Sequence, residues 1–224
     1  MPIAFFDFDG TLINTSSAKV SMLEFYRRGE LSLMTLIEGT LWGLGHFFNL
    51  ADGEKMFIAG LRAVAGFEEE RLRSLLEEVF EKELISRIYI EGLEAIKMHK
   101  ERGDEVAILS SSPEYLLNLY AEFAGIENVI CSKNIVKNGI MTREVVKPIC
   151  YGEGKVFWAN KFVEERGLTW EGSHYYTDSH SDLPMLVTVE NPICVNPDIR
   201  LRLEARKRGW TVAKYRETLS QKKP

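Results

Sequence analysis

Apolar runs that end in polar residues alternate with segments of helical periodicity along most of the chain. Such runs, followed directly by loop residues, predict buried strands, and one-sided apolar spacing that stops at a glycine predicts helices. The predicted strands cover residues 3–8, 105–109, 128–131, 174–177 and 192–195, and the predicted helices between them cover 93–102, 114–124 and 155–166. This alternation is typical of βαβ units. The pattern therefore predicts an α/β fold with a Rossmann-like, mainly parallel sheet flanked by helices.

A block of helices interrupts this alternation once, directly after the first strand. Every element predicted between residues 15 and 87 is helical, with helices expected at 18–28, 31–48, 53–64 and 68–85. We therefore expect an all-helical cap domain at 15–87, inserted into a catalytic core formed by 1–14 and 88–224. A short hairpin with an Asn-Gly turn is predicted at 135–141.

The segment 31–50 raises the question of membrane contact, since its length matches the roughly 20 residues of a spanning helix. Its apolar side chains recur at helical spacing and its polar residues fall mostly elsewhere, as in an amphipathic helix. Glu38 and three glycines oppose insertion into lipid. The favoured interpretation is a buried cap helix or helix pair. A surface that contacts a membrane or binds lipid is left open, and a membrane span is least favoured.

The composition is that of an ordinary globular protein, because 45% of the 224 residues are apolar and 27% are charged. The net charge of −5 lacks the positive field of a general nucleic-acid binder, so no nucleic acid is expected as a partner. Cys131, Cys150 and Cys194 are widely spaced, which argues against a disulfide framework or a zinc site. The N-terminus lacks the pattern of a signal peptide, and we expect a cytoplasmic protein.

Candidate chemistry lies where the predicted strands end. Asp7 and Asp9 stand at the end of the first strand, Ser110 follows the second, and Asp178 and Asp182 follow a later one. Ligands of open α/β sheets sit beyond the carboxyl ends of the strands, so these residues are expected at one rim. Carboxylates that converge there repel each other, and Mg²⁺ relieves such repulsion while it leaves room for a phosphate.

Four motifs in order make the sequence resemble the haloacid dehalogenase superfamily, subfamily IB, and most closely its phosphoserine-phosphatase-like branch. The resemblance covers essentially the whole chain. The first motif is Asp-Phe-Asp-Gly-Thr-Leu at 7–12, the second is Ile-Leu-Ser-Ser at 108–111, the third is the lysine at 155, and the fourth runs from 178 to 186. The first motif is highly specific to the family, and the fourth is strong evidence for it. The second and third are weak alone, but they lie where the family pattern places them.

The resemblance implies phosphoryl transfer through an aspartyl-phosphate. Asp7 would be the nucleophile, and Asp9 would be the general acid that protonates the leaving oxygen and then the base that activates water. Mg²⁺ would be held by the Asp7 carboxylate, the Asp9 backbone carbonyl and Asp178.

The resemblance also assigns the residues around the phosphate. Ser110 and Ser111, with nearby backbone amides, and the Lys155 ammonium would hold the phosphoryl oxygens. Asp182 would orient Lys155 or a metal-bound water.

The surroundings of the leaving group depart from the family pattern. Ser16 stands where phosphoserine phosphatases usually carry a glutamate that recognises serine, and Ser-Ser-Ser replaces Ser-Gly-Gly at 110–112. Arg62 is a further candidate for contact with an anionic substrate. Trp42, Phe47 and Phe48 in the cap would tolerate a less polar leaving group.

These observations predict a Mg²⁺-dependent phosphomonoester phosphatase that acts on a small phosphorylated metabolite. One alternative is an authentic phosphoserine phosphatase, and a second is a phosphotransferase or phosphomutase. A third, from another class, is a phosphate-binding module that has lost the reaction. The cap is expected to open and close over the rim.

Overall fold

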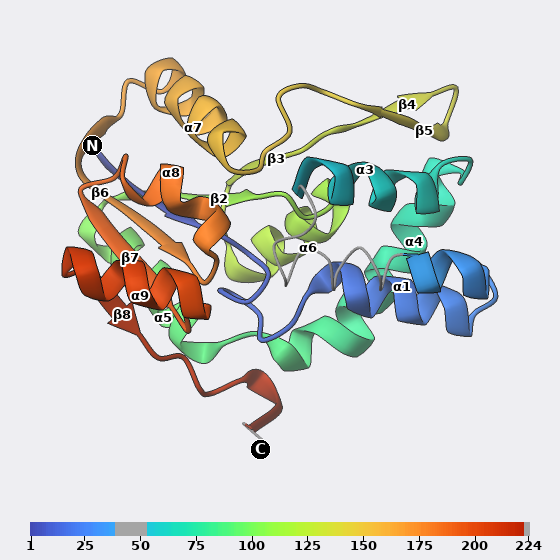
Figure 1. Ribbon diagram of the computed structural model, residues 1–224, viewed down its shortest axis with the longest axis horizontal. Coiled ribbons are helices and arrows are strands. Elements are labelled where there is room, and N and C mark those ends of the chain that lie inside the picture. Colours follow the sequence, from blue (N-terminus) through green and yellow to red (C-terminus); the bar gives the residue numbers. More distant parts are fainter. Residues whose placement is uncertain (39–52, 222–224) are drawn as a thin grey trace.

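The computed structural model describes residues 1–38 and 53–221, and its centre is a six-stranded parallel sheet (Figure 1). The strand order is β3-β2-β1-β6-β7-β8. The strands are β1 (Pro2–Phe6), β2 (Glu105–Ser110), β3 (Asn128–Cys131), β6 (Thr169–Thr177), β7 (Asn191–Val195) and β8 (Thr211–Ala213). The predicted α/β fold with a parallel sheet is confirmed.

The pairing of β1 decides where the polar strand ends meet. Phe6, the last residue of β1, lies between Ile108 of β2 and Tyr176 of β6. All three strands run in the same direction, so the residues that follow them emerge at one edge of the sheet. Asp7, Ser110 and Asp178 are therefore neighbours because of register, although up to 171 positions separate them in the sequence.

Helices cover both faces of the sheet, and the alternation of side chains along β1 shows how. Phe6 packs in a core with α5 (Ile90–Arg102) and α6 (Glu114–Ala124), whereas Phe5 packs in a second core on the opposite face. That second core holds residues of α7 (Glu153–Glu165), α8 (Leu183–Leu186) and α9 (Ile199–Arg208). The result is a three-layer α/β/α arrangement, as two-sided burial of a parallel sheet requires.

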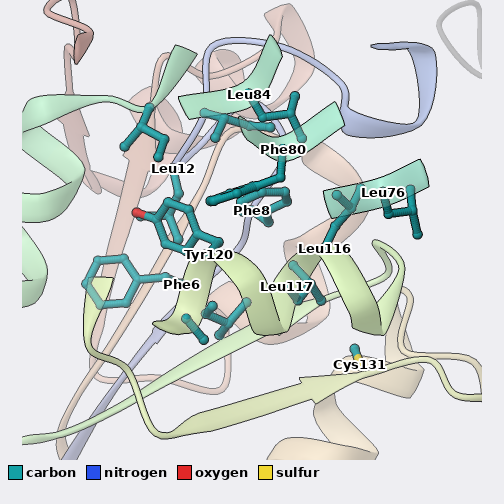
Figure 2. Packing of buried hydrophobic residues seen from close by; sticks show 14 of the residues in the cluster. Phe6, Phe8, Leu12, Leu76, Phe80, Leu84, Leu116, Leu117, Tyr120 and Cys131 are labelled. Atoms are coloured by element: carbon teal, nitrogen blue, oxygen red, sulfur yellow. The ribbon is translucent and has the colours of Figure 1, made fainter. Parts of the chain in front are cut away.

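The described elements between residues 15 and 87 are all helical, as expected. They are α1 (Ser17–Arg27), a helical stretch at 33–38, α3 (Gly53–Val64), α4 (Glu69–Val79), a π-helix (Phe80–Leu84) and a short 3₁₀-helix (Ile85–Arg87). The helix predicted at 68–85 is present, but its last turns are a π-helix and a 3₁₀-helix, and Phe80 and Leu84 in the π-helix are both buried in the core shared with α6 (Figure 2). Because this core is continuous between cap and sheet, the division into two domains stays a prediction.

A hairpin that leaves the sheet braces the cap. Its strands, β4 (Asn134–Lys137) and β5 (Ile140–Val145), are joined by Asn138 and Gly139, both with positive φ, which is the Asn-Gly turn expected there. The Gly66 amide donates to the Met141 carbonyl at 2.9 Å, and the Glu69 amide donates to the Gly139 carbonyl at 2.8 Å. The hairpin therefore lies over α3 and fixes the turn between α3 and α4 (Figure 1).

The structure describes only residues 31–38 of the segment 31–50. Residues 33–38 are helical, and in the described parts of the chain no helix is both long and apolar enough to cross a membrane. Trp42, Phe47 and Phe48 lie outside the described residues.

Candidate active site

Asp7 lies at the centre of the rim, immediately after β1. Its amide donates to the Tyr176 carbonyl at 2.9 Å, and its side chain is largely buried. Lys155 Nζ lies 3.1 Å from Asp7 Oδ1, and the Ser110 hydroxyl also hydrogen-bonds to this carboxylate. Burial raises the pKa of Asp7, and the positive charge of Lys155 opposes that rise.

Asp178 packs directly against the loop that carries Asp7. Gly10 has a φ of +73°, and a Cβ at this position would lie only 2.2 Å from Asp178 Oδ2. The Thr11 hydroxyl donates to Asp178 Oδ1 at 3.4 Å. Glycine is therefore required at position 10 both for its backbone conformation and for the approach of the Asp178 carboxylate.

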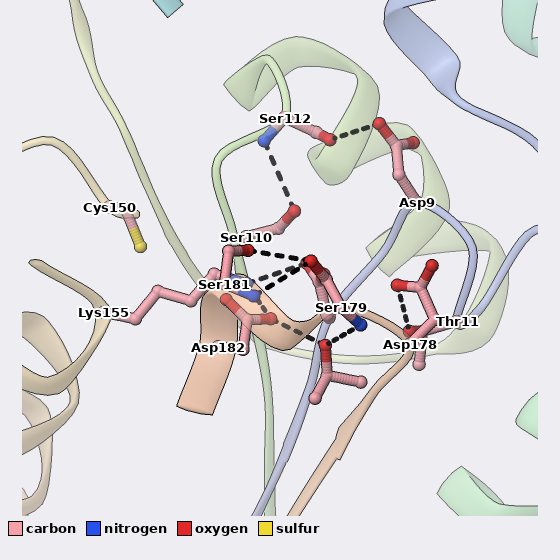
Figure 3. A network of polar contacts seen from close by, with 12 residues as sticks. Asp9, Thr11, Ser110, Ser112, Cys150, Lys155, Asp178, Ser179, Ser181 and Asp182 are labelled. Carbon is pink, nitrogen blue, oxygen red and sulfur yellow. Dashed lines mark hydrogen bonds and ion pairs between the residues drawn. The ribbon is translucent and has the colours of Figure 1, made fainter. Parts of the chain in front are cut away.

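Asp9 turns toward the start of the cap. Its Oδ1 accepts the Ser17 amide at 2.8 Å, and its Oδ2 accepts the hydroxyls of Ser17 at 3.1 Å and Ser112 at 3.2 Å. Burial nevertheless raises the pKa of Asp9 to about 6, because loss of water outweighs these hydrogen bonds. Asp9 is thus held between the start of the cap helix α1 and the loop after β2, and Figure 3 shows its contact with Ser112 in that loop.

Lys155 is buried and contacts several polar groups of the protein. Besides Asp7, its ammonium donates to Asp182 Oδ2 at 2.8 Å and to the Tyr175 hydroxyl at 2.9 Å. Asp182 Oδ2 also accepts the hydroxyls of Tyr175 and Thr177, each at 2.7 Å. The two carboxylates raise the pKa of Lys155 despite its burial, so the lysine stays charged.

The start of α7 places this lysine. A Cβ on Gly154 would lie 1.8 Å from the Ile149 carbonyl oxygen, so glycine lets the first turn of α7 approach the preceding loop. Lys155 follows directly and points into the rim (Figure 3).

The rim has the chemistry that a hard divalent cation requires. Burial raises the pKa of Asp178, and the negative charges of Asp7 and Asp182 raise it further. Asp182 Oδ1 is buried and has no hydrogen-bond partner in the described parts of the chain. A nearby cation, or water held by one, would relieve both the repulsion and the unsatisfied oxygen.

The available donor set is small. Among residues 1–38 and 53–221, no three His, Cys, Asp or Glu side chains converge as a metal site. The set expected here has two carboxylates, Asp7 and Asp178, and the Asp9 carbonyl. Such a set fits Mg²⁺, which usually keeps several waters, better than a metal that needs a full protein cage.

The second motif provides the other side of the rim. Ser110 is buried, and its Oγ accepts the Ser112 amide at 3.3 Å, whereas Ser111 is half-buried. The segment leads into α6, which begins at Glu114, so these serines lie just before a helix N-terminus, which favours anions.

The two candidates for substrate contact lie elsewhere. Ser16 is half-buried at the N-cap position of α1, where its side chain makes no cap hydrogen bond, and Arg62 is exposed in the last turn of α3. Their contact with substrate stays a prediction.

The contacts that several polar residues make in the site were not expected from the sequence. These residues are Thr11, Ser17, Ser112, Tyr175 and Thr177. The period of two along β6 is a usable signal, because it turns Tyr175 and Thr177 to one face, beside Asp182.

Comparisons with known proteins agree with this geometry. The family model of haloacid dehalogenase-like hydrolases matches residues 4–187. The chain is 30% identical over 218 residues to a protein of Mycobacterium tuberculosis named phosphoserine phosphatase SerB1, covering 95% of this chain and 70% of that protein. It is 27% identical over 219 residues to a histidinol-phosphatase of Neisseria meningitidis, covering 96% and 99%.

A solved structure has the same fold. It is described as a phospho-aspartyl intermediate analogue of phosphoserine phosphatase, with a TM-score of 0.73 and 18% sequence identity, over 98% of this chain and 96% of that one.

Proposed function

The chain is a phosphatase of the haloacid dehalogenase-like hydrolase family, and we propose that it hydrolyses a small phosphomonoester with Mg²⁺, through a phosphoryl group carried on Asp7. The observation that carries this proposal is the contrast between two neighbouring carboxylates. Asp7 faces the ammonium of Lys155, whereas the hydrogen-bond donors to Asp9 among the described residues are neutral, and Asp9 has a pKa of about 6. Different environments give two aspartates different roles.

Asp7 is the nucleophile. One of its oxygens forms a bond to phosphorus while the bond from phosphorus to the leaving oxygen breaks, which gives an aspartyl-phosphate and the alcohol. Lys155 favours the ionised form of Asp7 and is close enough to attract the phosphoryl oxygens as well. Ser110 and the amide of residue 111 would donate to the phosphoryl oxygens, whereas the Ser112 amide is already bound to Ser110 Oγ.

Asp9 is the general acid and then the general base. In its neutral form it gives a proton to the leaving oxygen, and as a carboxylate it then takes one from the water that attacks phosphorus, which releases phosphate and restores Asp7. A pKa of about 6 keeps both forms accessible near neutral pH. Ser17 and Ser112 hold the carboxyl group in place for both steps.

Asp7, Asp178 and the Asp9 carbonyl would hold the Mg²⁺ ion. When bound, the ion neutralises negative charge on the phosphoryl group and on the carboxylates around it. Asp182 is tied to Lys155, Tyr175 and Thr177 through one oxygen, so its second oxygen keeps a fixed direction beside this set.

The leaving group is less constrained than the phosphoryl chemistry. The named relatives act on different substrates by their names, one on phosphoserine and one on histidinol phosphate. Ser16 in place of a glutamate removes a charge that would recognise an ammonium group of serine. A screen of phosphorylated amino acids, sugars, nucleotides, phosphocholine and short lipid phosphates identifies the class, and efficient turnover of phosphoserine would favour the phosphoserine phosphatase alternative.

The decisive test uses p-nitrophenyl phosphate. The proposal predicts hydrolysis that requires Mg²⁺ and that disappears in Asp7→Asn, while Asp9→Asn strongly lowers the rate. Serine at position 111, half-buried and outside the acid–base pair, gives a control variant, Ser111→Ala, with a smaller loss. Phosphate binding without turnover would instead support a binding module, and a phosphorylated acceptor among the products would support a phosphotransferase.

A further inference from the structure

The helix α9 (Ile199–Arg208) has an unusual composition for a chain of net charge −5. It carries five basic residues, Arg200, Arg202, Arg206, Lys207 and Arg208, and one acidic residue, Glu204. Its inward face is narrow, since Leu201 and Ala205 are the buried residues that attach it to the sheet at β7 and β8 (Figure 1). Most of the helix surface is therefore free to contact something else.

The outward face has an ordered pattern. Ile199 and Leu203 lie four residues apart on one side of the helix and are 75% and 65% exposed. Helical spacing places Arg202 and Arg206 along one flank of this pair, and Arg200 and Lys207 along the other; all four are exposed. The surface is an aliphatic centre between two basic flanks.

The charges of this surface are largely uncompensated. Glu204 pairs with Lys207 and Arg208, and Asp198 is engaged at the start of the helix. Arg200 and Arg206 have no hydrogen bond or ion pair to any of the described residues. Exposure of two large aliphatic side chains to water is unfavourable, so they favour contact with an apolar partner. The unpaired arginines beside them favour a partner that is anionic.

We propose that this outward face of α9 binds an anionic lipid surface. Arginine stems can lie along acyl chains while their guanidinium groups reach lipid phosphates, and the aliphatic pair between them can enter the boundary region. A nucleic acid or a soluble polyanion would use the arginines but would give Ile199 and Leu203 no apolar environment. The pattern thus favours a membrane over these anions.

The face is connected to the active site through Asp198. This residue caps α9 by accepting the Leu201 amide at 2.8 Å, and its own amide donates to the Asp178 carbonyl at 2.9 Å. Its Oδ2 also accepts the His180 amide at 2.8 Å. A membrane bound at the N-terminal half of α9 would therefore lie beside the loop that carries Asp178.

The test is co-sedimentation of the full chain with vesicles of phosphatidylcholine, with and without one-third phosphatidylglycerol. We expect binding to the mixed vesicles only. Combined Arg200→Gln and Arg206→Gln should weaken it about 30-fold, since each basic residue near an anionic leaflet contributes roughly fivefold. Combined Ile199→Ala and Leu203→Ala should weaken it at least about tenfold, since one buried methylene contributes roughly fourfold.

A matched control separates this face from the cap. Leu33 and Met34 are 54% and 66% exposed, and Leu33→Ala with Met34→Ala should leave vesicle binding intact. Hydrolysis of p-nitrophenyl phosphate and the Tm should be unchanged in the α9 variants, which separates loss of binding from loss of folding or of the active site.

Several results would overturn the proposal. They are wild-type protein that ignores anionic vesicles, binding that only the cap variant loses, and soluble polyphosphate binding as tight as vesicle binding and unaffected by the alanine variant. A dimer that Ile199→Ala with Leu203→Ala converts to a monomer, without vesicle binding, would identify the face as a contact between two copies of the chain.

Discussion

Raising the pH should destabilise the metal-free protein through Asp9, and Asp9→Asn should remove that contribution. Asp9 has a pKa of about 6 in the folded protein, against an ordinary value of 3.8. Between these two values the folded state keeps a proton that the unfolded state has released. Because the folded state then binds more protons, the free energy of unfolding falls as the pH rises through this window.

The size of the effect follows from the shift. A difference of about two pKa units at 1.36 kcal/mol each corresponds to about 3 kcal/mol. Burial is the main cause, the negative charge of Asp7 adds to it, and the hydrogen bonds from Ser17 and Ser112 reduce it. Measurements at about pH 4 and about pH 7.5 span most of the window, so about 2.5 kcal/mol should be visible.

The assay is urea unfolding of wild type and Asp9→Asn in the presence of a chelator, at both pH values. The variant should gain about 2.5 kcal/mol relative to wild type on going from the lower to the higher pH. The substitution also changes the hydrogen bonds with Ser17. This change alters the stability of the variant equally at both pH values, so it cancels when the two values are compared. An equal stability difference at the two pH values would refute the reasoning.

Glu78→Gln is a control of opposite sign. Hydrogen bonds from Lys82 and Arg28 lower the pKa of Glu78, so its contribution to stability is present at neutral pH and lost as the pH falls. This variant should therefore lose stability relative to wild type at the higher pH. A shift in the same direction as that of Asp9→Asn would point to a general effect of removing a negative charge.

Three other predictions concern the rim. Mg²⁺ should raise the Tm of wild type more at about pH 7.5 than at about pH 5, because its ligands must be ionised. Asp178→Asn should raise the Tm of the metal-free protein yet abolish this response to Mg²⁺. A Tm of the variant that still rises with Mg²⁺ would contradict Asp178 as a ligand. Gly10→Ala should lower the free energy of unfolding by more than the roughly 1 kcal/mol of left-handed strain alone, since its Cβ would lie 2.2 Å from Asp178 Oδ2, and urea unfolding measures it. Tyr175→Phe should cost about 1.5–3 kcal/mol by leaving Asp182 with fewer donors, whereas Tyr120→Phe, whose buried hydroxyl has no partner among the described residues, should cost almost nothing; equal losses would contradict the role of the Tyr175 hydroxyl.

The centre of the site was predictable because its residues follow apolar strands. A strand buried on both faces of a parallel sheet is a continuous apolar run, and Asp7 and Ser110 stand where such runs stop, whereas Asp178 follows the mixed segment 174–177. Because the three strands are parallel, their carboxyl ends lie at the same edge of the sheet. The same signal predicted five of the six strands of the sheet but not β8.

Residues that act through packing or register were not predictable in this way. Tyr175 and Thr177 contact Asp182 only because β6 presents them on the face beside α7, and Ser17 reaches Asp9 only because the chain turns into α1 there. The helix α9 carries no apolar stripe, since two residues of it suffice to attach it to the sheet. Where the buried face of a helix is this small, hydrophobic periodicity does not predict the helix.

Trapping the phosphoryl group during turnover tests the central claim most directly. The enzyme is quenched in acid while it hydrolyses p-nitrophenyl phosphate with Mg²⁺, and its peptides are analysed by mass spectrometry. The account predicts one added phosphoryl group on the peptide that contains Asp7, and its absence in Asp7→Asn. A phosphoryl group on Ser110, or turnover by Asp7→Asn at the wild-type rate, would contradict it.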